Sequence, residues 1–270
     1  MAHDSGEPNS SEERGPRQSA GSRQPHRPRQ LADRPWPEVS RPVVCLPFGS
    51  IEQHGPHLPL DTDTAVATAV AQRLAGRLAA AGTDVVMAPP VAYGSSGEHE
   101  HFAGTVSIGR DALEVLLLEY GRSACRWAEK LVIVNGHGGN VDVLTAAVPR
   151  LVHEGRDVAW LGCVPEAPDG DDGGAPLDAH AGRVETSLML HLQPERVHLD
   201  RAEPGNTEPL RALLPELRRG GVAGVAANGI LGDPRGASAA EGERLLSAMV
   251  EAAWRDYVAW TPTASGRLVA

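Results

Sequence analysis

The sequence contains little cysteine and no long apolar run. Cys45, Cys125 and Cys163 are odd in number and form no CxxC pair, so neither a disulfide framework nor a thiolate zinc site is expected. No apolar stretch approaches the roughly 20 residues that span a bilayer, and the polar N-terminus lacks the apolar segment of a signal peptide. We therefore expect a cytoplasmic protein that has no membrane partner.

Aromatic residues and positive charge are also scarce. The 270 residues carry a formal net charge of -10, which argues against nucleic acid as a partner. Aromatic residues make up 4% of the chain and hydrophobic residues 41%, so alanine, valine and leucine must form most of the core. A chain of this length can bury a sizeable core, and we expect one folded domain.

Two segments have the composition of irregular chain. Residues 1–38 are rich in Ser, Pro, Gly, Gln and Arg, and they predict a disordered tail ahead of a domain at residues 39–262. Residues 164–178 combine acidic residues with several Gly and Pro, and they predict a loop that is mobile or covers a site.

The rest of the chain alternates short apolar runs with longer amphipathic stretches. In the stretch 64–81, Val66, Val70, Leu74 and Leu78 are spaced by four residues and share one face of a helix. Strands separated by such helices favour βαβ crossovers, and so an α/β fold with a mostly parallel central sheet flanked by helices. The predicted strands are residues 43–46, 84–88, 131–134 and 157–163; the predicted helices are residues 64–81, 111–129, 140–153, 183–192 and 239–260, with a polar stretch and a Gly-rich passage (220–236) before the last.

Polar side chains follow the first predicted strand. Glu52 and His54 are separated by one residue, so in an extended segment both side chains project to the same side, and Asp63 follows after two prolines. Open α/β sheets bind ligands at such carboxyl ends of strands. Two carboxylates and an imidazole suit Zn, Mn or Fe, although the same residue types in a turn are also typical of a solvated loop.

A second polar cluster follows the strand predicted at residues 131–134. There the chain reads Asn-Gly-His-Gly-Gly-Asn and continues into a helix, which puts His137 at the same edge of a parallel sheet as the first cluster. The glycines allow a sharp turn and a close approach to a ligand. An ordinary strand-to-helix turn is the alternative, whereas a phosphate loop would need a GxxxxGK pattern, which is absent.

Two further clusters supply acids and imidazoles. The segment DAHAGRVETS contains His180 and Glu185 and leads into a helix whose dipole favours a carboxylate in the first turn. Glu185 is therefore a candidate ligand or a capping residue. Glu98, His99 and His101 lie in a loop-like segment, and the sequence does not decide their roles.

In their order along the chain, the segments GSIEQHGPHLPLDTD, YGSSGEH, VNGHGGN and DAHAGRVETS resemble those of the creatininase family. The resemblance covers residues 43–257. It implies a creatininase-like layered fold with two divalent metal ions (Zn, Fe or Mn) and a metal-activated water that opens an amide. It assigns Glu52 and His137 to one metal, His54 to the other and Asp63 to the bridge between them.

The chain departs from creatininase proper in the second cluster. Creatininase proper has a Glu two positions after the histidine that matches His137, and this chain has Gly139. We therefore predict Glu185 as the remaining ligand, as in family members that share NGHGGN. His180 is our candidate for proton transfer to the leaving amine, with a hydrogen bond to a metal ligand as its alternative role. The missing Glu argues against creatinine as the substrate.

Three other stretches, PLDTDT, FAGTVSIG and NGILGDPRGASAAEG, resemble a peptidase branch of the family. This resemblance implies a metal-dependent peptidase that acts on a precursor peptide whose C-terminal Val-Tyr has been modified by a radical SAM enzyme, and that releases this terminal unit. The alternatives are hydrolysis of a small cyclic amide or a formamide, and a non-catalytic metal or ligand sensor. The family also implies a homo-oligomer.

Overall fold

The computed structural model describes residues 1–3, 28–165 and 178–270. Within these ranges, five strands form one sheet in the order β1-β3-β2-β4-β5, and every pair is parallel. The carboxyl ends of the strands therefore lie at one edge of the sheet. The strands are β1 (Arg29–Gln30), β2 (Val43–Phe48), β3 (Val85–Met87), β4 (Lys130–Asn135) and β5 (Val158–Gly162).

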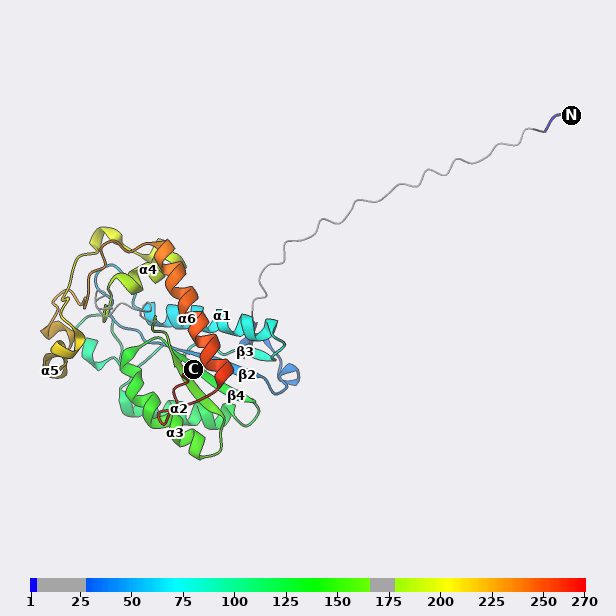
Figure 1. Cartoon of the computed structure of the whole chain (residues 1–270), viewed down its shortest axis with the longest axis horizontal. Helices are drawn as coiled ribbons and strands as arrows, with labels where there is room; N and C mark the ends of the chain where they lie inside the picture. Colours follow the sequence, from blue (N-terminus) through cyan, green and yellow to red (C-terminus); the bar gives the residue numbers. More distant parts are fainter. Residues whose placement is uncertain (4–27, 166–177) are drawn as a thin grey trace.

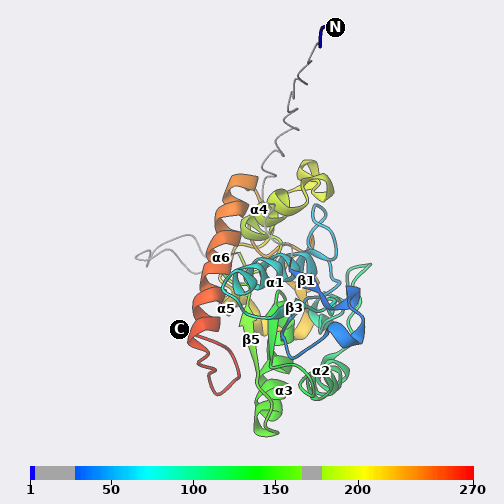
Figure 2. The same ribbon diagram turned by 90° about the vertical axis from the view of Figure 1, so that its right-hand side faces the viewer.

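Helices cover both faces of this sheet (Figure 1). Figure 2 shows the last helix, α6, running alongside α4 and α1 on one side. Every residue of β2 is buried, as expected for a strand with helices on both faces. The predicted α/β fold with a flanked parallel sheet is thus confirmed. The first face is covered by α1 (Thr62–Ala80), α4 (Arg183–Leu192) and α6 (Ala239–Ala259), and the second by α2 (Arg110–Ala124) and α3 (Val141–His153).

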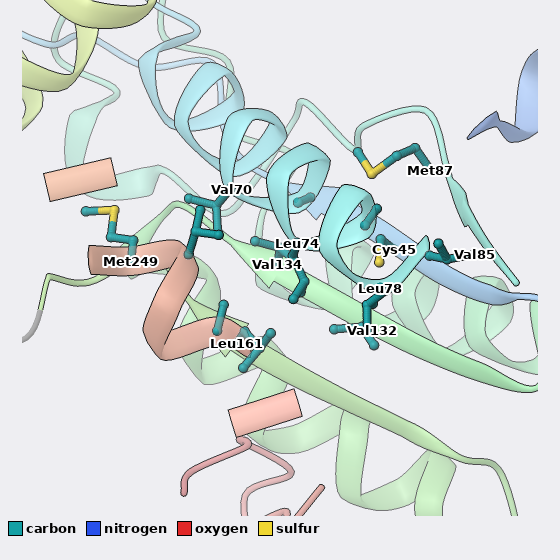
Figure 3. Close-up of a cluster of buried hydrophobic side chains, with 14 of the residues drawn as sticks. Cys45, Val70, Leu74, Leu78, Val85, Met87, Val132, Val134, Leu161 and Met249 are labelled. Atoms are coloured by element: carbon teal, nitrogen blue, oxygen red, sulfur yellow. The ribbon is translucent and has the colours of Figure 1, made fainter. Parts of the chain in front are cut away.

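Successive side chains of each strand point into two different apolar cores. Cys45 and Val132 face the core beneath α1 and α6 (Figure 3), whereas their neighbours Val44 and Leu131 face the core beneath α2 and α3. The alternation is that of regular strands. The predicted face of α1 belongs to the first core and contributes Val66, Val70, Leu74 and Leu78.

The predicted helices and strands are confirmed, with bounds that shift by a few residues. The largest shift is in α2, which ends at Ala124 and not at residue 129, because the chain must turn before β4 starts at Lys130. One strand and one α-helix were not predicted. Strand β1 is too short for any alternation, and α5 (Leu210–Gly220) contains Pro215 and lies in a stretch that we had described as polar.

The described residues take part in the fold beyond both ends of the predicted domain at residues 39–262. Arg29–Gln30 pairs with β3, and Leu268 near the C-terminus is buried. Residues 4–27 of the predicted tail and residues 166–177 of the predicted acidic loop lie outside the described residues. In the part of the chain that the structure describes, no helix combines the length and apolarity of a membrane span.

Candidate metal centre

Loops that leave two neighbouring strands meet at the carboxyl edge of the sheet. β2 pairs with β4 up to Phe48 and Asn135, so the segment with Glu52 and His54 leaves the sheet beside the segment with His137. The predicted meeting of the first two polar clusters is therefore confirmed. Helix α1 begins at the end of the first segment, which brings its first turn to the same place.

Asp63 lies in that first turn, between two imidazoles. Its Oδ1 is 3.2 Å from His54 Nε2, and its Oδ2 is 3.1 Å from His137 Nδ1. Ser50 Oγ donates a hydrogen bond of 2.7 Å to Oδ2 and holds the carboxylate in place. All four residues are buried. Each oxygen of this carboxylate therefore faces a different imidazole. A carboxylate that is shared by two metal ions would have the same arrangement.

Glu52 is a buried carboxylate without a hydrogen-bond donor. Its side chain is 1% exposed, and neither oxygen accepts a hydrogen bond from the described residues. Three ring nitrogens face it, His137 Nε2 at 3.2 Å, His99 Nε2 at 3.4 Å and His180 Nδ1 at 3.7 Å. Burial raises the pKa of Glu52 to about 7. Because a buried carboxylate without a donor is costly, the site fits a cation bound beside Glu52.

Gln53 fixes the protonation of two imidazoles, one through its side-chain amide and one through its main-chain oxygen. Its Oε1 accepts a hydrogen bond of 2.9 Å from Gly55 N, and its Nε2 donates one of 2.9 Å to Gly229 O, which establishes which end is the NH2 group. The second N–H lies 2.9 Å from His99 Nδ1, which must therefore be the acceptor. His180 Nε2 lies 2.7 Å from the main-chain oxygen of Gln53 and must be a donor.

These two rings therefore present opposite groups to the site. His99 carries its proton on Nε2, the nitrogen that faces Glu52, whereas His180 faces Glu52 with the lone pair of Nδ1. Burial lowers the pKa of His99 to about 3 and the pKa of His180 well below its usual range, so both rings are neutral at pH 7. His99 thus directs an N–H group toward Glu52 without completing a hydrogen bond, whereas His180 directs a lone pair and is a base or a ligand.

One ring nitrogen of His54 bonds to the backbone, and the other points into the site. Its Nδ1 donates to the main-chain oxygen of Glu52 at 3.1 Å, so Nε2 faces Asp63 and, at 3.9 Å, Glu185 Oε2. Burial opposes charge on this ring, but Asp63 and Glu185 outweigh it and raise the pKa of His54 to about 10. Glu185 in turn accepts a hydrogen bond of 2.6 Å from Ala181 N, and burial raises its pKa.

Three overlapping sets of side chains have ligand atoms close enough to share an ion. In each set these atoms lie within 4.8 Å of one another, and imidazole with carboxylate suits Zn, Mn and Fe alike. His137 adjoins these sets through Glu52 and Asp63. All six residues predicted from the sequence are therefore together, while their division between two ions stays a prediction. The sets are Glu52 with His99 and His180, His54 with His180 and Glu185, and Glu52 with His54 and Asp63.

Sequence reasoning left two functional residues without a role. His99 had been grouped with His101 in a loop, but it is buried against Glu52, whereas His101 is exposed on the cleft wall. Gln53 stands between two predicted ligands, and no pattern in the sequence indicates its role. The only sequence signal for His99 was the segment YGSSGEH.

Gly139 occupies the position where creatininase proper has a glutamate. A Cβ atom there would collide with Ser95 O, His137 Nε2 and Glu98 Oε1, so this backbone admits only glycine. The Glu98 carboxylate lies on this side of the site, 4.0 Å from His137 Nε2, and is 37% exposed. The acid missing at Gly139 is therefore partly replaced in space by Glu98.

The centre opens into a cleft of about 750 Å³. Glu52, His99, His137 and His180 line one part of it, and residues of helix α5 line another. A cleft of this volume has room for several residues of a peptide, because drug-sized ligands occupy pockets of roughly 300 to 1,000 Å³.

Comparison with known proteins identifies several relatives along most of the chain. The family model for creatininase (creatinine amidohydrolase) matches residues 32–256. A mycofactocin precursor peptide peptidase of Mycobacterium ulcerans (strain Agy99) is 55% identical over 231 residues, which are 84% of this chain and 89% of that protein. A creatinine amidohydrolase of Pseudomonas putida is 32% identical over 237 residues, 77% of this chain and 86% of that protein.

Solved structures with the same layered fold include several creatininases. A tryptophan-to-alanine mutant creatininase superposes with a TM-score of 0.71 at 28% identity, covering 87% of this chain and 100% of that one. A structure described as creatininase Mn has a TM-score of 0.64 at 30% identity and covers 83% and 95%. A mutant creatininase of Zn-Zn type has a TM-score of 0.63 at 30% identity and covers 82% and 93%.

Proposed function

Because this chain belongs to the creatininase family, we propose that it is a metal-dependent peptidase that releases the modified C-terminal Val-Tyr unit from the mycofactocin precursor peptide. The 55% identity to a peptidase of that name, over 84% of the chain, supports the substrate. The observation that carries the chemistry is the buried Glu52 carboxylate, which accepts no hydrogen bond from the described residues and lies among three imidazoles beside Asp63.

Five side chains would hold the two divalent ions, which we propose to be Zn, Fe or Mn. When bound, such ions polarise the scissile carbonyl and lower the pKa of a water that attacks it. Asp63 would serve both ions because its two oxygens face different imidazoles. The proposed ligands are Glu52, His54, Asp63, His137 and Glu185.

His180 would move the proton in this reaction. Its Nδ1 is unprotonated and faces the cleft side of Glu52, so it accepts a proton at Nδ1 as the amide is attacked and then donates it to the leaving amine nitrogen. The main-chain oxygen of Gln53 holds Nε2–H throughout at 2.7 Å, which keeps the ring oriented while Nδ1 changes protonation. His99 Nε2–H faces the Glu52 carboxylate and would orient it.

Cleavage of the authentic peptide tests this proposal. The protein would be stripped with a chelator, reloaded separately with Zn²⁺, Mn²⁺ or Fe²⁺, and incubated with precursor peptide before and after radical SAM modification. Mass spectrometry should detect the terminal unit only with reloaded protein and modified peptide. Release that persists in the fully stripped protein would exclude a metal-dependent reaction. Turnover of a formamide or a small cyclic amide, with no turnover of the peptide, would instead support the alternative substrates.

We also propose that the chain forms a homo-oligomer. The resemblance to the creatininase family supports this proposal. Light scattering should therefore report a multiple of the 28.5 kDa chain mass. A monomer at micromolar concentration would contradict this proposal.

A further inference from the structure

Helix α5 lies at the periphery of the molecule, away from the sheet (Figure 1), and it lines the cleft of the metal centre. Leu210, Leu214 and Leu217 all face the cleft, and their spacing of four and three residues puts them on one side of the helix. We call these residues the leucine stripe. Leu210 is 46% exposed and Leu214 is 40% exposed, so the described chain does not cover them.

One buried leucine attaches this helix to the site. Leu213 packs into a small apolar cluster with Val222, Ala226 and Leu231. The backbone N–H of Leu231 donates a hydrogen bond of 2.9 Å to His180 O. The cluster that supports α5 is therefore continuous with the segment that carries His180.

The cleft also has a cation for which the described residues provide no counter-ion. Three arginines line it, and two of them are paired, Arg110 with Asp142 at 3.7 Å and Arg219 with Glu216. Arg218 forms no ion pair with any described residue. It follows the leucine stripe on the same side of α5, because it stands eight residues after Leu210. An unpaired arginine beside an apolar stripe, in a chain of net charge -10, marks a place for an anion.

We propose that the leucine stripe and Arg218 bind the peptide substrate, the stripe through an apolar side chain and Arg218 through a carboxylate of the same peptide. This inference rests on the proposed peptidase function and specifies its substrate class. The substrate is a peptide that carries an apolar residue and an acidic residue within about four residues of each other.

The length of the stripe indicates how much of a bound peptide it can contact. Eight residues of helix span roughly 12 Å, whereas an extended peptide advances about 3.3 Å per residue. A bound peptide therefore needs about four residues to reach from Leu210 to Arg218.

Steady-state kinetics with the modified precursor peptide test the proposal. Leu214→Ser should raise KM roughly 10-fold and change kcat less than about twofold, because the stripe contributes binding that is equal in ground and transition states. Arg218→Glu should lower kcat/KM by about 10-fold at low salt, and by less at high salt, because screening weakens a charge contact. In both variants the metal content and the melting temperature should equal those of the wild type.

Matched variants outside the cleft provide the controls. Leu116→Ser on α2 replaces a leucine that is 36% exposed, and Arg244→Glu on α6 replaces an exposed arginine. Precursor peptides in which each acidic residue is replaced in turn by its amide then identify the partner of Arg218, since the Arg218→Glu defect should vanish for that peptide alone.

Two outcomes separate the inference from the function that it rests on. If the wild type cleaves the peptide, and Leu214→Ser and Arg218→Glu behave like the two controls, the binding role of α5 is wrong and the peptidase function stands. If the reloaded wild type cleaves no precursor peptide, the proposed function is wrong, and the inference with it.

Discussion

The cleft has an inner and an outer part, and they are built in different ways. The inner part is the metal centre, whose histidines and acids are mostly buried and are held by hydrogen bonds to one another and to the backbone. The outer part is helix α5, which has one buried residue, Leu213, and leaves most of its stripe exposed. The inner part has a fixed geometry, and the outer part has a free surface.

This difference corresponds to two tasks. Chemistry needs charges that are held in place in a dry site, because their arrangement must not change during the reaction. Recognition of one peptide among many needs an exposed surface that can differ between relatives with the same chemistry. Changes in the inner part should therefore affect metal content and kcat, and changes in the outer part should affect KM.

The largest effect should follow from Asp63→Ala. We expect loss of activity and of most bound metal, because the two imidazoles that Asp63 separates would then face two cations without their shared carboxylate. Metal analysis by mass spectrometry measures this directly. Asp61→Ala is the matched control, since Asp61 lies two residues earlier and pairs with Arg196. Full metal content in Asp63→Ala would contradict the bridging role.

Substitutions of His180 and of Glu185 should lower the activity for different reasons. His180→Asn should keep the metal and lose roughly 10²-fold to 10⁴-fold in turnover, the range of a positioned general acid or base. Glu185→Gln should lower metal occupancy, and excess metal should restore part of its rate. Single-turnover rates beside metal analysis distinguish the two.

The structure sharpens this test, because His180 shares ligand-distance sets with both Glu52 and His54. If His180→Asn loses metal and recovers with added ion, His180 is a ligand and not the proton carrier. If Glu185→Gln keeps its metal but is inactive, the acid carries the proton.

A smaller effect is expected from Gln53, which positions two rings and touches no reacting atom. Gln53→Glu replaces the NH2 donor by an acceptor, so His99 should move its proton from Nε2 to Nδ1. We expect a loss of about 10-fold to 100-fold in activity, as for other residues that orient metal ligands. Nitrogen-15 NMR of the metal-free protein reports the tautomer of His99 in Gln53→Glu, with Gln53→Met as the neutral comparison. An unchanged tautomer in Gln53→Glu would show that the amide does not set it.

The sequence predicted the inner part far better than the outer part, for physical reasons. Glu52, His54 and His137 follow strands with clear apolar runs, and parallel strands bring their carboxyl ends to one edge. Helix α5 has its leucines at helical spacing, but Pro215 and the surrounding arginines make its stretch polar in composition. Its role depends on a cleft that only the folded chain forms.

The tautomers in the inner part were also beyond sequence reasoning. Gln53 meets His180 across 127 positions of chain and His99 across 46, so no local pattern links them. The strand β1 was missed for another reason, because two residues cannot show an alternation of period two.

The smallest effect on activity should come from the anchor of the outer part. Leu213→Ala removes buried methyl groups from the small cluster beneath α5, whereas Leu117→Ala removes them from the main core beneath α2. Leu117→Ala should lower the free energy of unfolding by about 2 to 5 kcal/mol. Leu213→Ala should lower it by less, because only α5 and its neighbours depend on that cluster, and opening of α5 is local.

Hydrogen exchange separates the two variants. In Leu213→Ala we expect faster exchange confined to α5 and the turn that follows it, with a KM for the peptide that is raised a few-fold and an unchanged kcat and metal content. In Leu117→Ala exchange should rise across the sheet and its helices, because the opening there is global. If Leu213→Ala also lowers kcat or releases metal, the hydrogen bond from Leu231 to His180 transmits the disturbance inward. Helix α5 and the metal centre would then be structurally coupled, and they could not be treated as separate binding and catalytic parts of the cleft.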